Sequence, residues 1–323
     1  MKSLMRRFMS FLCLGIAVFA LGSACRQDSY QNLTAPVENC RIVQHSIGQS
    51  CIPLHPQRIV ALDILSLSNA IALGIKPIAA AVWNNDIPPH LIKQLEGVTL
   101  YRYSTSQPDL ERILQLKPDL IISPSDPSLR NLYPQLSQIA PTVLVPWAEI
   151  SRDWKQHLIE TAKVFNQQEA AAQLLENYYQ RVKDLKQRLK VVKSQQEEPF
   201  YASFIFVSDG LVLAQQDSFA GELLHDLGLL SPQSSSDARF PISEETLPEI
   251  ESDVFFVGSY QDSDHLLLER LQCRPLWSKV RAVQQNRVYS VNFLPWYGFD
   301  FLSAHTVLDD IEKHLVKMPP LGR

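Results

Sequence analysis

Glycine is scarce in this chain, at 11 of 323 residues. The sequence has no Gly-x-Gly-x-x-Gly segment and no Walker loop, so neither a dinucleotide nor a nucleotide phosphate is an expected ligand. It also lacks the Gly-x-Ser-x-Gly turn that carries the nucleophile of many hydrolases. Together these absences favour a binding protein without intrinsic cofactor over an enzyme.

Histidine and positive charge are thinly spread as well. No two of the eight histidines lie within four residues of each other, so the helical pair typical of zinc sites is missing. A zinc or manganese site built from distant histidines is the alternative, but we expect no directly bound metal. Without residues 1–24, 27 Lys and Arg face 34 Asp and Glu, a net charge of −7. A nucleic-acid partner, which calls for a basic stripe, is therefore excluded.

Only one apolar run is long, and it lies at the start of the chain. Phe8 to Leu21 is too short to span a bilayer but follows Lys2, Arg6 and Arg7, as in a signal peptide. The next residues, Leu21-Gly22-Ser23-Ala24-Cys25, resemble the bacterial lipobox, with Gly22 as the imperfect position. We expect a signal peptide at 1–24, a lipid anchor on Cys25 and a flexible tether over 25–38. The alternative is ordinary cleavage after Ala24 and a free periplasmic protein; in either case the protein lies outside the cytoplasmic membrane.

Cysteines are few, which suits a small number of defined roles. Cys40 and Cys51 lie 11 residues apart across a hairpin-like segment. In an oxidising compartment they are expected to form a disulfide, the alternative being two unpaired thiols. Cys273 has no evident partner and is expected to be a buried structural thiol.

Strand-like and helix-like segments alternate on both sides of a glycine-free and proline-free stretch. Apolar runs at 58–62, 77–82, 119–123 and 142–145 predict buried strands, as do 201–207, 253–257 and 287–292. Between them, the 3–4 spacing of apolar residues predicts one long helix at about 166–194. The sequence therefore predicts an α/β lobe at 39–150, a helical segment at 151–198 and a second α/β lobe at 199–323.

Six segments, in order, resemble the iron–siderophore substrate-binding proteins of ABC importers. They are Cys40–Gly48 with Pro56–Leu62, Pro108–Ile122, Asp217–Gly228, Ile242–Leu247, Pro275–Trp277 and Asn286–Tyr289. The resemblance implies two Rossmann-like lobes joined by a single long helix. It also implies a monomeric receptor that captures a ferric siderophore between its lobes and delivers it to a membrane permease. Trp277, inside one of these segments, is expected to be core packing.

Aromatic residues follow strand ends in both predicted lobes, where ligands of open α/β sheets bind. Such rings offer contact area to a large chelate, and an arginine offers a fork of hydrogen bonds to its oxygens. Core packing is the alternative for the aromatic residues, and an exposed surface charge is the alternative for the arginine, which is placed in a loop. The candidates for ligand binding are Trp83, Arg102, Tyr103, Tyr260, Trp296 and Tyr297.

Two glutamates match positions at which the family contacts its permease, and the resemblance assigns docking to Glu111 and Glu245. Both lie near helix starts, where acidic residues are favoured in any case. Asp109 is interpreted as a helix-start residue alone.

Two other functions are kept as alternatives. The same importer class could carry heme or cobalamin, with Tyr103 or Tyr260 as an axial ligand for heme. An exported α/β enzyme or assembly factor could also use this scaffold.

Overall fold

The computed structural model of the protein describes residues 40–83, 87–103, 108–147, 153–193, 200–207, 210–231, 239–260 and 264–317. These residues form two five-stranded sheets and a separate two-stranded hairpin. The predicted signal peptide, Cys25 and the whole of the predicted tether lie outside the described residues.

The N-terminal lobe is a parallel sheet in the order β5-β4-β3-β6-β7. Its strands are β3 (Ile59–Ala61), β4 (Ala79–Trp83), β5 (Thr99–Tyr103), β6 (Leu120–Pro124) and β7 (Thr142–Val145). Its helices are α2 (Ile64–Ala72), η2 (Pro89–Leu95), α3 (Leu110–Gln115) and α4 (Pro127–Ile139). The hairpin of β1 (Cys40–His45) and β2 (Gly48–Pro53) packs beside β7. Every residue of β6 and β7 is buried, as expected for strands covered on both faces.

The C-terminal lobe has the order β10-β9-β8-β11-β12, in which β8, β11 and β12 are parallel. Its strands are β8 (Ala202–Val207), β9 (Leu211–Ala214), β10 (Arg239–Ile242), β11 (Val254–Ser259) and β12 (Val288–Ser290). Its longer helices are α7 (Phe219–Asp226), α8 (Asp264–Gln272) and α11 (Phe301–Ile311), which continues as η6 (Glu312–Val316). Four shorter ones are η4 (Glu244–Glu249), η5 (Trp277–Lys279), α9 (Arg281–Gln284) and α10 (Phe293–Trp296).

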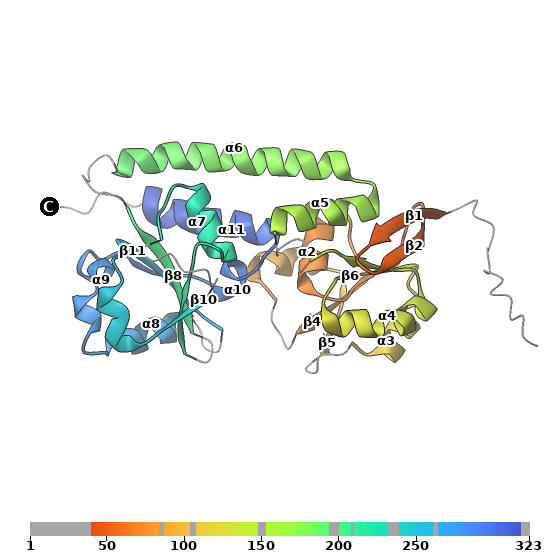
Figure 1. The fold of residues 1–323 in the computed structure, drawn as a ribbon, viewed down its shortest axis with the longest axis horizontal. Helices are drawn as coiled ribbons and strands as arrows, with labels where there is room; N and C mark the ends of the chain where they lie inside the picture. The colour runs from red at the N-terminus through yellow and green to blue at the C-terminus, as the bar shows by residue number, and fades with distance from the viewer. Residues whose placement is uncertain are drawn as a thin grey trace, which may run out of the picture. The chain divides into compact units, whose positions relative to one another are not determined.

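Between the two lobes the chain forms α5 (Trp154–Phe165) and the 26-residue helix α6 (Gln168–Lys193), shown in Figure 1. The long helix α6 begins at Gln168, two residues after the approximate start that the sequence predicts. Asn166 has a φ of 55° and caps the end of α5 in the left-handed conformation, which asparagine tolerates better than most residues. The prediction of two α/β lobes joined by one long helix is confirmed.

A strand was missed at the edge of the first sheet. The residues around Arg102 form β5, paired in register with β4, and not the loop that the sequence predicts. An edge strand has one face open to solvent, so its pattern is less apolar than that of a central strand.

Apolar residues form one core that both lobes share and one further cluster in each lobe. The shared cluster includes residues of β3, β8, α2, α5, α6 and α11. A second cluster lies between the N-terminal sheet and α3–α4, and a third between the C-terminal sheet and α8–η5. Trp277, 6% exposed, belongs to the third cluster, as the sequence predicts.

Buried polar contacts also join the two lobes. Ser68 of α2 donates a hydrogen bond to Asp300, the N-cap of α11. Asn69 donates to the His157 imidazole at 2.9 Å and accepts from the Phe301 backbone at 3.5 Å. Burial lowers the pKa of His157 to about 3 and raises that of Asp300, so the imidazole is neutral near pH 7. The lobes therefore meet through a specific polar contact as well as through apolar packing.

Candidate functional site

The carboxyl ends of β4 and β5 bring three predicted ligand residues to one edge of the N-terminal sheet. The register pairs Trp83 with Tyr103 and Val82 with Arg102. Arg102 is exposed. The side chains of Trp83 and Tyr103 lie outside what the structure describes. Because successive strand residues alternate between faces, Arg102 lies on the opposite face from Tyr101, which is buried in the α3–α4 cluster.

A second group of charged residues lies at the ends of β3 and β6, and sequence reasoning missed it. Asp63 caps α2 by accepting hydrogen bonds from the Leu65 and Ser66 backbones, each at 3.1 Å. Burial raises the pKa of Asp63 to about 6, and the negative charge of Asp126 adds to the effect. Beyond β6, the Arg130 Nε donates to the buried Ser125 hydroxyl at 2.8 Å. The sequence did contain a signal for this group, the Ser-Asp-Pro helix start at Ser125 directly after a buried strand. It places the first turn of α4 at this edge of the sheet.

The carboxyl ends of β8, β11 and β12 carry a set of aromatic rings. Tyr260 meets the Phe293 ring edge-on at 5.6 Å, and Phe293 stacks on Tyr297 at 5.1 Å. Phe206, near the end of β8, lies 5.2 Å from Phe293. Tyr260 is 41% exposed and Tyr297 is partly buried. Gly258 permits this packing, because a Cβ there would lie 3.2 Å from the Phe293 Cα.

The aromatic row continues across to the N-terminal lobe through residues that the sequence did not single out. Tyr297 contacts Phe299 edge-on at 5.5 Å, and Phe299 contacts Trp147 at 5.6 Å. Trp147 follows β7, whereas Phe299 belongs to the C-terminal lobe. The row from Tyr260 to Trp147 therefore links the carboxyl-end edges of the two sheets. We call the five residues Trp147, Tyr260, Phe293, Tyr297 and Phe299 the aromatic row.

Trp296 is not part of this surface, contrary to the sequence prediction. It is 1% exposed, its ring lies 4.5 Å from that of Phe256, and its indole N–H donates to Asp310 at 2.9 Å. The chain turns by one short helix, α10, so neighbouring residues point to different sides. Trp296 is therefore core packing of the C-terminal lobe.

The two predicted docking glutamates are exposed, one in each lobe. Glu111 lies in the first turn of α3, whose N-cap Asp109 accepts a hydrogen bond from the Arg112 backbone at 3.1 Å. Glu245 lies in the first turn of η4. Hydrogen bonds from its own backbone N–H and from Ser243 hold the Glu245 pKa below its usual value. Asp109 is the helix-start residue that the sequence predicts.

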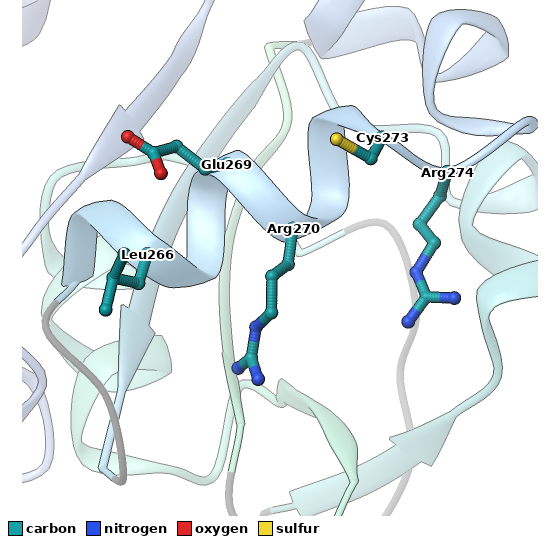
Figure 2. Close-up of a pocket in the computed structure, with 5 residues that line it drawn as sticks. All are labelled: Leu266, Glu269, Arg270, Cys273 and Arg274. Carbon is teal, nitrogen blue, oxygen red and sulfur yellow. The ribbon is translucent and has the colours of Figure 1, made fainter.

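The described cysteines fall into two classes. Cys40 and Cys51 are both disulfide-bonded, whereas Cys273 is free. The prediction that Cys273 is buried is wrong, because its side chain is exposed at the end of α8. It lines a surface cavity of about 550 Å³ together with Leu266, Glu269, Arg270 and Arg274. Figure 2 shows the two arginines extending to the same side of this segment, with Cys273 on the other.

Neither that cavity nor a second one, of about 370 Å³ between α6 and Glu312, includes a predicted ligand residue. No group of His, Cys, Asp and Glu suited to a metal ion occurs within the described segments. Among these segments, too, no helix combines the length and apolar character needed to cross a bilayer.

Comparisons with known proteins agree with this architecture. The family model described as "Periplasmic binding protein" matches residues 59–293. A probable siderophore-binding lipoprotein of Bacillus subtilis, YfiY, is 29% identical, with 97% of this chain and 99% of that protein covered. An achromobactin-binding periplasmic protein of Dickeya dadantii is 31% identical, with 80% and 86% covered.

Among solved structures, Staphylococcus aureus SirA in complex with staphyloferrin B superimposes with a TM-score of 0.69 at 24% identity, covering 85% of this chain and 98% of that one. At this level of identity the likeness supports the two-lobed fold alone. The sequence match over residues 59–293 goes further, and on that evidence the chain belongs to the periplasmic binding protein family.

Proposed function

We propose that this protein captures a ferric siderophore between its two lobes and delivers it to the permease of an ABC importer. The observation that carries the proposal is the aromatic row, which joins the carboxyl-end edges of both sheets. Ligands of open α/β sheets bind at such edges. The names of three relatives support the same proposal, because they describe proteins that bind a siderophore, ferric citrate or achromobactin.

The chemistry of the two edges suits a ferric chelate. A siderophore complex is large, partly apolar and often anionic. Aromatic rings on the C-terminal edge supply contact area, and Arg102 on the N-terminal edge supplies hydrogen bonds and positive charge. We assign ligand contacts to Arg102, Tyr260 and Tyr297, and add Trp147 and Phe299 from the geometry. We also assign ligand contacts to Trp83 and Tyr103, because their backbones pair at the carboxyl ends of β4 and β5.

Delivery requires a membrane location and a docking register. A lipid anchor at Cys25 holds the protein as a monomer on the outer face of the cell membrane, where the family works. Glu111 and Glu245, one exposed carboxylate in each lobe, are assigned to the permease. Two carboxylates at a fixed separation speed the encounter with the permease and fix the orientation of the bound protein. They contribute less to the affinity between the two proteins. The protein catalyses no step in this scheme.

The decisive test is a titration of tryptophan fluorescence with ferric hydroxamate, ferric citrate and ferric catecholate chelates. Saturable quenching by one class is expected, and Tyr260→Ala should weaken that binding by about tenfold because a half-exposed ring is lost from the contact. Tyr179→Ala is the matched control, since Tyr179 is 51% exposed on α6. No quenching by any chelate would contradict the proposal, and a Soret band on adding heme would favour the heme carrier instead.

A further inference from the structure

The segment 42–54, which contains most of the hairpin β1–β2, exposes large aliphatic side chains and carries no formal charge. Ile42, Ile47 and Leu54 are 54%, 38% and 49% exposed. Ten large hydrophobic side chains are exposed among the described residues, and three of them fall within these 13 positions. The segment 42–54 contains no Lys, Arg, Asp or Glu. We call Ile42, Ile47 and Leu54 the hairpin patch.

Buried residues of the hairpin fix it to the N-terminal lobe, while the patch residues stay exposed to solvent. The Ser50 hydroxyl donates to the Thr142 carbonyl at 2.7 Å, and the Ser46 backbone donates to Leu144 at 3.1 Å. Val43 and Ile52 are buried in the shared core. The one titratable group in the segment, His45, points the same way, with its ring 3.1 Å from Ser50. Burial lowers the His45 pKa, so the segment 42–54 is uncharged at neutral pH, and the nearest charged side chain of the hairpin is Arg41.

Chain connectivity indicates what covers the patch. Residues 25–39 join the proposed lipid anchor to the hairpin, and a flexible segment of that length has an end-to-end distance of roughly 20 Å. The hairpin is thus separated from the anchor by a short length of chain and stays close to the bilayer surface. At such effective concentrations a weak apolar contact is sufficient to orient the body.

The charge of the protein also favours the lipid surface as the partner of the hairpin patch. The mature chain has a net charge of −7, so anionic headgroups repel its body. An uncharged face with aliphatic side chains approaches such a surface at the least electrostatic cost. The hairpin runs along β7, an outer strand of the N-terminal sheet, from the Ser50–Thr142 contact to the Ser46–Leu144 contact.

We propose that the hairpin patch rests on the lipid surface to which the chain is tethered. The inference rests on the anchor at Cys25 that forms part of the proposed function, and not on which chelate is bound.

Hydroxyl-radical footprinting tests the contact directly, because it reports the water exposure of Ile and Leu side chains. Mature protein with Cys273→Ser is coupled through Cys25 to a maleimide lipid in phosphatidylethanolamine–phosphatidylglycerol vesicles. The reference is the same protein capped at Cys25 with N-ethylmaleimide and free of vesicles. Trypsin cuts after Arg41 and Arg58, so one peptide contains the whole patch.

Oxidation of that peptide should fall by about threefold on vesicles, because side chains in the headgroup region are shielded from water. Peptides with Ile92 and Leu266, which are 60% and 52% exposed, should be unchanged. In Ile42→Ser/Leu54→Ser, oxidation of Ile47 should return to the vesicle-free level, whereas Ile92→Ser/Leu266→Ser should keep Ile47 protected.

Equal oxidation with and without vesicles would overturn the proposal. So would protection already present without vesicles, which would mean that the tether itself covers the patch. Since the anchor is attached chemically, neither result depends on whether cells acylate Cys25, and siderophore binding is measured separately by quenching.

Discussion

At the residue scale, the neighbours Trp296 and Tyr297 have different environments. The indole of Trp296 fills the core and donates to Asp310, while the Tyr297 ring stacks in the aromatic row. One step along the short helix α10 turns the side chain by roughly 100°, enough to move it from core to surface. A sequence pattern predicts the same role for two neighbouring aromatic residues. The conformation of the backbone decides which of them is buried and which lies in the aromatic row.

Replacing Trp296 by Phe should therefore affect stability and spare binding. Loss of the indole N–H leaves Asp310 with one fewer partner, and we expect the free energy of unfolding to fall by about 1–2 kcal/mol. Urea denaturation and chelate titration of the same preparation measure the two effects. Tyr297→Ala is the counterpart, expected to weaken chelate binding by about tenfold. A loss of affinity in Trp296→Phe would restore Trp296 to the site.

Asp63 gives a prediction about pH. Its folded pKa of about 6 exceeds the value of 3.8 for an unperturbed aspartate. The folded state therefore holds its proton more tightly than the unfolded state between those values, and the contribution of Asp63 to stability falls as the pH rises through that window. Asp63→Asn keeps an N-cap acceptor and removes the titration. We expect a flatter pH profile and a gain of about 1–2 kcal/mol at pH 7 relative to wild type. Denaturation profiles at pH 4, 5, 6 and 7 check this, and parallel curves for the two proteins would contradict it.

At the scale of elements, the predicted central strands match the structure because burial on both faces leaves continuous apolar runs, as in β6 and β11. The long helix matches because its one buried face repeats apolar residues at a spacing of three to four. The edge strand β5 and the antiparallel pair β9–β10 were missed, since edge pairing depends on the neighbouring strand and leaves little pattern of its own. In the candidate site, aromatic residues close to the ends of predicted strands were found, among them Trp83 and Tyr260. Trp147, Phe299 and Arg130 were missed, because tertiary packing brings them to the site.

The attachment of α5 to α7 depends on Lys155. Its ammonium, 15% exposed, lies 2.6 Å from Glu222 and 3.0 Å from Asp226, which also accepts from the Tyr178 hydroxyl of α6. Lys155→Met would leave two partly buried carboxylates without their cation, so we expect a loss of about 3 kcal/mol in unfolding free energy.

That deficit should shrink at lower pH. Burial already raises the pKa of Glu222, and removing Lys155 raises it further, so protonation relieves the repulsion in the folded variant as the pH falls. Urea denaturation at pH 8 and pH 5 measures the difference. Lys163→Met, which removes an exposed pair with Glu160, is the control and should change stability by less than about 0.5 kcal/mol. Equal effects of the two variants would contradict a structural role for the Lys155 network.

At the scale of the whole molecule, each lobe presents one of the proposed docking carboxylates. Glu111→Ala/Glu245→Ala should abolish chelate uptake in cells while leaving the affinity measured by quenching intact, because neither residue lies in the aromatic row. Glu96→Ala/Glu249→Ala, which also removes one exposed carboxylate from each lobe, is the control and should preserve uptake. Loss of chelate affinity in the Glu111/Glu245 variant would place these residues in the ligand site instead.

The shared core has a further consequence for the molecule as a whole. Residues of both sheets and of α2, α5, α6 and α11 belong to one buried cluster, and Asp300 and His157 are fully buried where the lobes meet. Unfolding one lobe alone would expose these groups without recovering the chain entropy of the other. We therefore expect one cooperative transition from two sheets, with equal midpoints by far-ultraviolet circular dichroism and tryptophan fluorescence and with matching calorimetric and van't Hoff enthalpies. Ser68→Ala/Asn69→Ala should lower the midpoint, since it removes hydrogen bonds across the lobes, and should begin to separate the two probes. Two resolved transitions in the wild-type protein would mean that the lobes are stable independently and that α6 joins them as a linker alone.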